Sequence, residues 1–231
     1  IQKSFISRDD PDRPLLGSMG IYLFKTSVLD QLLKELDVDD FGKEVIPHAI
    51  HSHKVVGYDF DGYWEDIGTM RSFYEANLAL TQPSPPFNFY DVNQPIYTHA
   101  RFLPGSIVAG GKLKDVSLSD GCSIGQAEIK NSVIGLRSQI QDGSIIRNTV
   151  IMGADYYEED SHKKSAVPIG VGKNSHIEGA IIDKNARIGE GVIIKPFPLG
   201  TEEEGENWFI RDGIVVIPKS VIIPPGTIIA P

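Results

Sequence analysis

A six-residue spacing of aliphatic side chains dominates the C-terminal half of this 231-residue chain. Small or polar residues, often glycine, fill the positions between them. A hexapeptide repeat of this kind is typical of a parallel β-helix, in which each six-residue unit forms one side of a prism. We predict such a β-helix over residues 106–231, with the repeated side chains pointing to its axis. These are Leu118, Ile124, Ile134, Ile140, Ile146, Met152, Ile182, Ile188, Ile194, Val216, Ile222 and Ile228.

The corners of the prism require backbone conformations that most residues avoid. Asn and Gly tolerate positive φ angles, so we expect Asn131, Asn148, Asn174 and Asn185 at corners. A β-sandwich of short strands is the alternative, and a period of six kept over several stretches disfavours it. The period breaks at residues 154–168 and 195–208, which we expect to leave the coil as loops on one face.

Residues 1–80 combine helical and strand-like patterns, as in the end of a larger α/β sheet domain. A helix of about ten residues is predicted to start at Ser27, with Asp30 completing a capping box. A second helix is predicted over 41–50, with a kink or early stop at Pro47. Thr69 is predicted to cap a third helix that reaches Leu80. Strands are predicted over residues 21–24, 54–60 and 63–67.

The prolines of residues 81–105 disfavour regular structure and predict an interdomain linker on a surface. The chain as a whole carries a net charge of −9, which argues against a general nucleic-acid-binding surface. It has no apolar run near the roughly 20 residues that span a bilayer. Its single cysteine, Cys122, excludes an internal disulfide framework and favours a reducing cytoplasm.

Two N-terminal residues are candidates for binding a phosphorylated substrate. Asp66 follows a predicted strand and precedes Gly68 and a helix, an arrangement that can hold Mg²⁺ against a phosphate. The spacing alone favours the alternative, in which Asp66 caps that helix. The Ser18 hydroxyl, before another predicted strand, can contact a sugar phosphate, although a lone serine is more often structural.

Basic residues in the C-terminal half can gather into a phosphate-binding pocket, although a solvated face is the default interpretation. They are Arg101, Lys112, Lys114, Arg137, Arg147, Lys173, Lys184, Arg187, Arg211 and Lys219. Many hexapeptide-repeat proteins are acyltransferases with a histidine as general base, so His176 is a further candidate. Glu178 is not an orienting partner by spacing alone.

Several segments resemble glucose-1-phosphate adenylyltransferases, particularly the plant and cyanobacterial branch, and they are collinear with that family over nearly the whole chain. They include residues 18–22, 40–47, 61–69 (Asp-Gly-Tyr-Trp-Glu-Asp-Ile-Gly-Thr), 95–98, 132–138, 152–157 and 182–189. The resemblance implies an α/β part of a Rossmann-like nucleotidyltransferase domain over 1–80, a linker over 81–105 and a left-handed parallel β-helix over 106–231. The β-helix would serve regulation and oligomerisation.

The family makes ADP-glucose and pyrophosphate from ATP and glucose 1-phosphate, with Mg²⁺, for glycogen or starch synthesis. The resemblance implies that Ser18 contacts the sugar phosphate and that Asp66 is one of two carboxylates holding the metal. It implies a homotetramer, in the cytoplasm or, in a plant, the plastid. Nucleic acid and membranes are not expected partners.

Allosteric control by a phosphorylated metabolite and by orthophosphate is also implied. Lys184 and Lys219 match the family's effector lysines, Arg101 matches an arginine that contacts the bound anion, and Asp183 lies next to that site. His99 stands where the family has glutamine. Residues 195–208 also depart from the plant-type pattern.

The family's Gly-rich nucleotide loop, its first metal-binding aspartate and its sugar-phosphate lysine precede the segments found in this sequence. We therefore expect no turnover by this chain alone. The alternatives are a non-catalytic β-helix module for oligomerisation or effector binding, another sugar-phosphate nucleotidyltransferase, and an acyltransferase that depends on His176.

Overall fold

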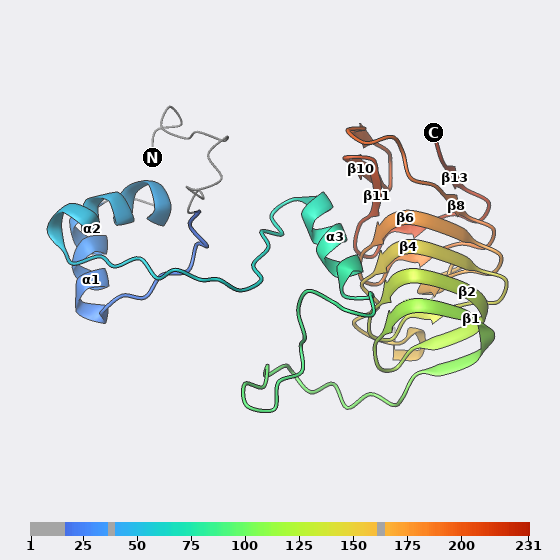
Figure 1. Ribbon diagram of the computed structural model, residues 1–231. Helices are drawn as coiled ribbons and strands as arrows, with labels where there is room; N and C mark the ends of the chain where they lie inside the picture. The colour runs from blue at the N-terminus through green and yellow to red at the C-terminus, as the bar shows by residue number, and fades with distance from the viewer. Residues whose placement is uncertain (1–16, 37–39, 161–164) are drawn as a thin grey trace. The chain divides into compact units, whose positions relative to one another are not determined.

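The computed structural model describes residues 17–36, 40–160 and 165–231. The chain forms two compact units, Ile1–Trp64 and Glu65–Pro231, which we describe separately. Figure 1 shows helices in the first unit, and one helix with a stack of parallel strands in the second. Among the described residues, no helix combines the length and hydrophobicity needed to cross a lipid bilayer.

The first helix, α1 (Thr26–Glu35), has Lys25 at its N-cap, two residues before the predicted capping residue Ser27. Its first turn is closed by the Lys25 carbonyl, which accepts hydrogen bonds from the amides of Val28 and Leu29, both at 3.0 Å. The predicted capping box of Ser27 and Asp30 is therefore wrong, because Ser27 already lies inside the helix. The Asp30 carboxylate instead pairs with Lys34, at 2.6 Å.

The helix predicted over 41–50 is split near its proline. A π-helical turn, η2 (Phe41–Val45), leads into α2 (Ile46–Ser52). Pro47 lies in the first turn of α2, where its missing N–H leaves no helical hydrogen bond unmade. Leu32, Val45 and Ala49 form the buried core of this unit.

The predicted strands over 21–24, 54–60 and 63–67 are wrong for the described structure, which shows them as irregular chain. A strand must satisfy its N–H and C=O groups on a neighbouring strand. Along the described residues the first strand starts only at Ile107, so these segments have no partner.

The second unit contains the predicted parallel β-helix. The long strands occupy two or more sides of a coil, and short strands occupy single sides. The strands are β1 (Ile107–Leu118), β2 (Ser123–Ile134), β3 (Gln139–Ile140), β4 (Ile145–Ile151), β5 (Gly170–Val171), β6 (His176–Ile182), β7 (Arg187–Ile188), β8 (Ile193–Ile194), β9 (Glu203–Glu204), β10 (Phe209–Arg211), β11 (Ile214–Ile217), β12 (Ile222–Ile223) and β13 (Ile228–Ile229). All pairings are parallel except those of β10 with β9 and β11.

Three columns of aliphatic side chains run through the stack, one behind each side of the prism. The first is Val108, Ile124, Ile140, Val171, Ile188 and Ile223. The second is Leu113, Ile129, Ile146, Ile177, Ile194 and Ile229. The third is Leu118, Ile134, Ile151, Ile182 and Ile217. Nearly all of these side chains beyond β1 are buried, so the hexapeptide prediction is confirmed for most of its members.

Four of the predicted inward residues point elsewhere. Ile151 occupies the axis in place of Met152, because the step across the Asn148 corner is five residues from Ile146. The inward positions of the last coil are likewise shifted by one residue from the prediction. Ile217, Ile223 and Ile229 are buried, while Ile222 and Ile228 are exposed. Val216 and Met152 instead pack outside the coil.

The predicted corner residues are confirmed. Asn131, Asn148, Asn174 and Asn185 have positive φ angles of 46°, 46°, 56° and 60°. The Asn131 amide donates to the Asn148 side-chain oxygen of the next coil at 2.8 Å. This hydrogen bond links the corners of two adjacent coils.

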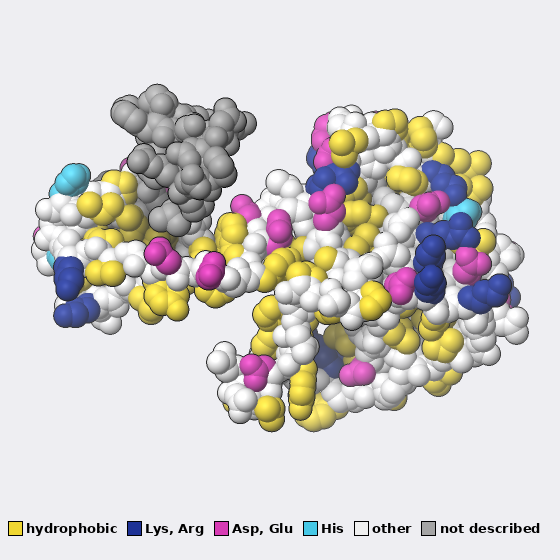
Figure 2. All heavy atoms as spheres, in the orientation of Figure 1, with side chains coloured by type: hydrophobic (Ala, Val, Ile, Leu, Met, Phe, Trp, Pro, Cys, Tyr) yellow, Lys and Arg dark blue, Asp and Glu magenta, His cyan; other side chains and the backbone are white. Residues whose placement is uncertain are grey.

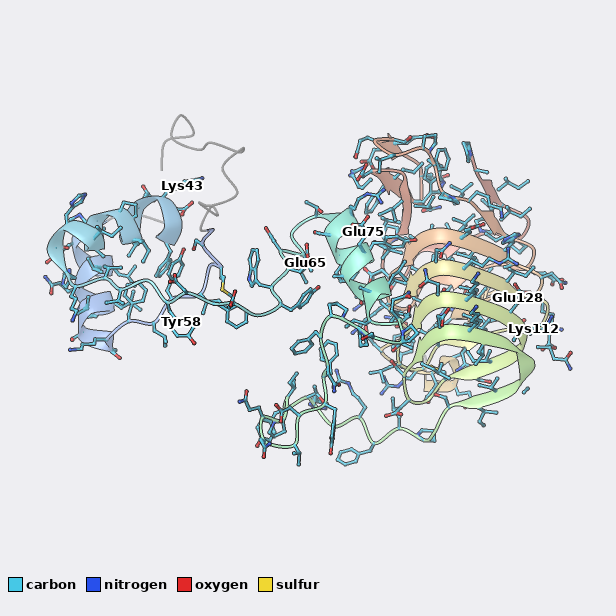
Figure 3. The ribbon with its side chains drawn as sticks, in the orientation of Figure 1. Lys43, Tyr58, Glu65, Glu75, Lys112 and Glu128 are labelled. Atoms are coloured by element: carbon cyan, nitrogen blue, oxygen red, sulfur yellow. The ribbon has the colours of Figure 1, made fainter. Side chains whose placement is uncertain are left out.

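The third predicted helix, α3 (Met70–Ala79), is confirmed with its Thr69 cap. The Thr69 hydroxyl accepts from the Ser72 amide at 3.1 Å, and Ser72 reciprocates to the Thr69 amide at 3.2 Å. Figure 3 shows α3, which carries the labelled Glu75, lying on the outside of the β-helix. Its Tyr74 and Leu78 side chains pack against Val150, Ile181 and Val216. The prediction assigned this helix to the N-terminal part, residues 1–80, whereas in the structure it packs against the β-helix.

Residues 81–105 contain neither helix nor strand, and many of their side chains are exposed. Tyr90, Val92, Tyr97 and Phe102 are among the large hydrophobic ones at the surface. The face of the molecule drawn in Figure 2 mixes hydrophobic and charged side chains. The described linker therefore matches the irregular chain that its prolines predict.

Candidate functional site

The Asp66 carboxylate lies in irregular chain, three residues before the cap of α3. One of its oxygens accepts a hydrogen bond from the Gly68 amide at 2.9 Å. Thr69, and not Asp66, caps the helix, so the capping alternative for Asp66 does not hold. Asp66 is exposed, which leaves its carboxylate open to a ligand from solvent.

Ser18 is exposed in the first unit. Its hydroxyl oxygen accepts from the Gly20 amide at 3.2 Å and lies 3.3 Å from the Tyr22 hydroxyl. The hydroxyl thus holds a local turn in the structure. This geometry neither requires nor prevents contact with a sugar phosphate.

Lys184 and Lys219 meet on the β-helix. Each follows an inward isoleucine by two residues, and these isoleucines, Ile182 and Ile217, are partners in the parallel ladder. The two lysines therefore occupy equivalent positions on adjacent coils. Both reach the same carboxylate: Lys184 Nζ lies 3.2 Å from Asp155 Oδ1, and Lys219 Nζ lies 2.7 Å from Asp155 Oδ2.

The electrostatics of this group follow from its contacts. The hydrogen bond from Lys219 holds the pKa of Asp155 at about 2, with Lys184 and Asn185 acting in the same direction. In return, Asp155 raises the pKa of Lys219. Asn185 fixes the acid by donating to its Oδ2 at 3.1 Å and accepting from its amide at 2.7 Å. The result is two ammonium groups around one carboxylate at the surface.

Asp183 and Arg101 take different places. The Asp183 carboxylate accepts from the Lys184 amide at 2.6 Å and so shapes the chain that presents the lysine. The exposed Arg101 donates to the His99 carbonyl at 2.7 Å. Within the described residues, no ion pair or hydrogen bond joins Arg101 to the lysine pair.

Comparison with known proteins identifies both parts of the chain. Residues 101–228 match a family model described as the GLGC left-handed parallel β-helix domain, and residues 9–83 match the nucleotidyl transferase model. A glucose-1-phosphate adenylyltransferase small subunit, chloroplastic/amyloplastic, from Triticum aestivum is 48% identical over 229 residues, covering 94% of this chain. The chain belongs to the glucose-1-phosphate adenylyltransferase family. It spans 48% of the length of that relative.

The family assignment confirms the predicted fold class, a nucleotidyltransferase portion followed by a left-handed β-helix. It also bears on His176, the residue that suggested an acyltransferase. His176 Nε2 lies 2.9 Å from Lys195 Nζ, and Lys195 pairs with Glu178 at 3.2 Å. Burial, and then the Lys195 charge, lower the pKa of His176. In this family member the histidine is part of a surface ion-pair group, and nothing in the comparisons favours acyl transfer.

The sequence alone did not reveal two acids, Asp155 and Glu158, that hold the start of the 154–168 loop against the β-helix. We call this loop and the 195–208 loop the two excursions from the coil. Asp155 joins the lysine pair, and Glu158 Oε2 lies 2.9 Å from the Arg187 guanidinium. Arg187 is 9% exposed at its side chain and also donates to the Val167 carbonyl at 2.8 Å. The coil register carried a usable signal, because Ile151 stacks on Ile182 and so brings the start of the excursion beside Lys184.

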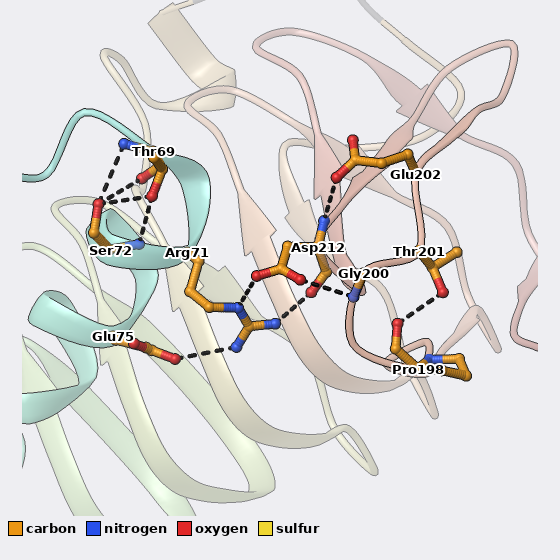
Figure 4. A network of polar contacts seen from close by, with 9 residues as sticks. All are labelled: Thr69, Arg71, Ser72, Glu75, Pro198, Gly200, Thr201, Glu202 and Asp212. Carbon is orange, nitrogen blue, oxygen red and sulfur yellow. Dashed lines mark hydrogen bonds and ion pairs between the residues drawn. The ribbon is translucent and has the colours of Figure 1, made fainter. Parts of the chain in front are cut away.

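A second group that the sequence did not reveal fastens α3 to the turn between β10 and β11, which in turn contacts the 195–208 loop (Figure 4). The Arg71 guanidinium donates to the Asp212 carboxylate and carbonyl and pairs with Glu75 at 3.1 Å. The Asp212 carboxylate also accepts from the Gly200 amide at 2.8 Å, and its own amide donates to Glu202 at 2.9 Å. The helix that follows Asp66 is thereby tied to the same β-helix that carries the lysine pair.

The described residues contain no cluster of three or more metal-ligating side chains. Mg²⁺ in nucleotide sites is commonly bound by one or two carboxylates together with phosphate oxygens and water. The exposed Asp66 carboxylate fits one such ligand. In the family assignment the phosphate oxygens would come from the substrates.

Proposed function

We propose that this chain is part of an allosterically regulated glucose-1-phosphate adenylyltransferase, which makes ADP-glucose and pyrophosphate from ATP and glucose 1-phosphate. In this reaction a phosphate oxygen of the sugar attacks the α-phosphorus of ATP. The bond from that phosphorus to the oxygen of the departing pyrophosphate breaks. The proposal is supported by the family assignment and by the Asp66 carboxylate, which does not cap α3 and is therefore available to a ligand.

Asp66 would hold Mg²⁺ as one of its carboxylate ligands, and Ser18 would contact the sugar phosphate. A bound Mg²⁺ supplies positive charge that offsets the charge developing on the phosphate oxygens. The Gly68 amide, by its hydrogen bond to Oδ1, restricts the rotation of the Asp66 carboxylate. The α3 helix that follows is anchored on the β-helix, so the position of Asp66 depends on the regulatory half of the chain.

The observation that carries the regulatory part of the proposal is the lysine pair around Asp155. Two ammonium groups on adjacent coils suit a phosphate or a phosphorylated metabolite, because each can donate to a different oxygen. Asp155 neutralises one of the two charges, so an anionic effector would compete with this carboxylate. Asp183 would orient Lys184, and Arg101 would join the anion through a change in its present contact with His99.

The complete enzyme would be a homotetramer, since exposed faces and ends of β-helices suit subunit association. Its compartment would be the plastid in a plant, as the name of the wheat relative states for that protein, and the cytoplasm otherwise.

The test uses the full-length protein encoded by the native gene, assayed for ADP-glucose synthesis with and without a phosphorylated activator. Lys184→Ala should reduce the response to the activator by about tenfold, and it should reduce the basal rate much less. Asp155→Asn should lower the activator concentration needed, because the competing carboxylate is gone. Lys173→Ala is the matched control, since Lys173 is an exposed lysine of the same β-helix.

Equal loss of basal and activated rates in Lys184→Ala would remove the regulatory role. Absence of ADP-glucose synthesis by the full-length protein would overturn the enzymatic proposal itself.

A further inference from the structure

Three cationic side chains stack in register on the outside of the β-helix. Lys114 of β1 is the ladder partner of Lys130 of β2, which is the partner of Arg147 of β4. Figure 2 shows Lys and Arg side chains gathered along this side of the β-helix, with a few acidic ones between them. We call these three residues the basic column.

Such an arrangement costs stability unless something offsets it. Neighbouring strands lie roughly 4.8 Å apart, and like charges placed directly opposite one another repel. The chain carries a net charge of −9, so the column does not reflect a generally basic protein. A local concentration of positive charge in an acidic chain calls for a counter-charge.

The neighbouring acids supply only part of it. Glu128 Oε1 accepts from Arg147 at 2.6 Å, and this contact, more than Lys112 or Lys130, lowers the pKa of Glu128. Glu178, the ladder partner of Arg147, pairs with Lys195 at 3.2 Å. In the part of the chain that the structure describes, Lys112, Lys114 and Lys130 have no ion-pair partner within 4.0 Å. Figure 3 shows Lys112 and Glu128 projecting from the same side of the stack.

An open groove of about 370 Å³ lies at the Lys130 and Arg147 end of the column, lined by Glu128, Lys130, Arg147, Asn148 and Glu178, and Lys114 lies outside this lining. Its volume is within the range of small-molecule sites, roughly 300–1,000 Å³. No aromatic side chain lines it, so a ligand would be held by its charges. The Arg147 Nε is buried and makes no hydrogen bond, which leaves this guanidinium incompletely satisfied.

We propose that the basic column binds a diphosphate group, either free pyrophosphate or the diphosphate of a nucleotide. Arg147 is already paired with Glu128, so Lys114 and Lys130 carry the charge that lacks an ion-pair partner among the described residues. Because neighbouring strands lie roughly 4.8 Å apart, a single phosphate can accept from cations on two adjacent coils, whereas two linked phosphates offer acceptor oxygens to all three coils. The site is separate from the lysine pair at Asp155, because Lys130 and Arg147 precede the Asn131 and Asn148 corners and Lys184 follows the next side of the prism.

The test is calorimetric titration of the chain with inorganic pyrophosphate, ADP and orthophosphate at low ionic strength. Pyrophosphate and ADP should bind similarly if the diphosphate alone is recognised, and orthophosphate should bind about tenfold more weakly. Tighter binding of ADP than of pyrophosphate would identify a nucleotide as the ligand. The double variant Lys114→Ala/Lys130→Ala should lose at least about tenfold in pyrophosphate affinity.

Two controls separate this site from general charge and from the effector site. Lys173→Ala should leave pyrophosphate binding unchanged, and Lys184→Ala/Lys219→Ala should retain it. The proposal is overturned if the wild-type chain does not bind pyrophosphate at millimolar concentration, if Lys173→Ala weakens binding as much as the column variant, or if Lys184→Ala/Lys219→Ala abolishes binding.

Thermal unfolding gives an independent readout. Lys130→Ala should raise the melting temperature of the ligand-free chain by relieving the repulsion, and pyrophosphate should stabilise the wild type more than the variant. A lower melting temperature for Lys130→Ala would contradict the repulsion on which the argument rests. Neither outcome affects the family assignment.

Discussion

The β-helix and the helical region of the first unit bury their hydrophobic residues to very different degrees. In the β-helix each coil covers its neighbour, and side chains such as Ile146 and Ile177 are fully buried. In the first unit only Leu32, Val45 and Ala49 are buried among the described residues, while Leu23 is fully exposed. A repeat supplies its own packing partner at every step, whereas a non-repeating helical segment depends on surfaces outside itself.

The largest test of this contrast is truncation of a side chain in the core. Ile177→Ala should lower the free energy of unfolding by about 3–4 kcal/mol, because it opens a cavity between two coils that cannot collapse. Leu23→Ala and Ile228→Ala, both at exposed positions, should each change it by less than about 0.5 kcal/mol. Urea denaturation followed by circular dichroism measures all three. A Leu23→Ala cost as large as that of Ile177→Ala would break the comparison.

The next test asks whether α3 belongs energetically with the β-helix. Arg71→Ala removes the ion pair and hydrogen bonds to Asp212 and should cost about 1–2 kcal/mol. The effect should appear as faster hydrogen exchange in α3 and faster proteolysis in residues 198–213. Glu75→Gln is the control, because Glu75 contacts Arg71 without reaching Asp212. Unchanged protection of α3 in Arg71→Ala would show that packing alone attaches the helix.

Tyr74 gives a second test of how α3 is attached to the β-helix. Its hydroxyl donates to the Asn148 carbonyl, and Tyr74→Phe should cost about 1 kcal/mol while keeping the ring packed. Burial raises the pKa of Tyr74 from 10.0 to about 12. Because folding raises this pKa, its contribution to stability is present below pH 10 and is lost as the pH rises through about 12. Absorbance titration of the phenol in wild type and Tyr74→Phe measures it, and ionisation near pH 10 would contradict the burial.

The smallest effect concerns the ion pairs that Asp155, in the 154–168 excursion, makes with Lys184 and Lys219. Folding lowers the pKa of Asp155 from 3.8 to about 2, so its stabilisation is present above about pH 4 and is lost as the pH falls toward 2. With both lysines partly exposed, the contribution should be about 1 kcal/mol or less. Denaturation of Asp155→Asn at several pH values should show a weaker loss of stability below pH 4 than wild type. Parallel curves for the two proteins would exclude this contribution.

The sequence predicted the β-helix because its signal is repeated, and it failed where the signal was single. Stacked isoleucines and corner asparagines each recur in several coils, so each position supports the others. The step from Ile146 to the next inward residue is five and not six, because it depends on the backbone angles at the Asn148 corner. The prediction therefore placed Met152 at the axis, where the structure has Ile151. The strands expected over 21–24 and 54–60 have suitable residues, but a strand exists only with a partner, and sequence spacing does not supply one.

The candidate site divides in the same way. Lys184 and Lys219 are equivalent positions on adjacent coils, and the resemblance named both. Asp155, which joins them, was missed because its contact depends on how the 154–168 excursion folds back. The network of Arg71 and Asp212 was missed because it links residues 141 positions apart through a helix that sequence assigned to another region.

The coils before and after the first excursion pair in register although extra chain lies between them. Ile146 pairs with Ile177, and Ile177 with Ile194, as if nothing had been inserted. Evolution is therefore free to lengthen, shorten or rewrite a loop at such a corner without rebuilding the interior. A fold of this kind lets surface loops diverge in sequence at little risk to the architecture.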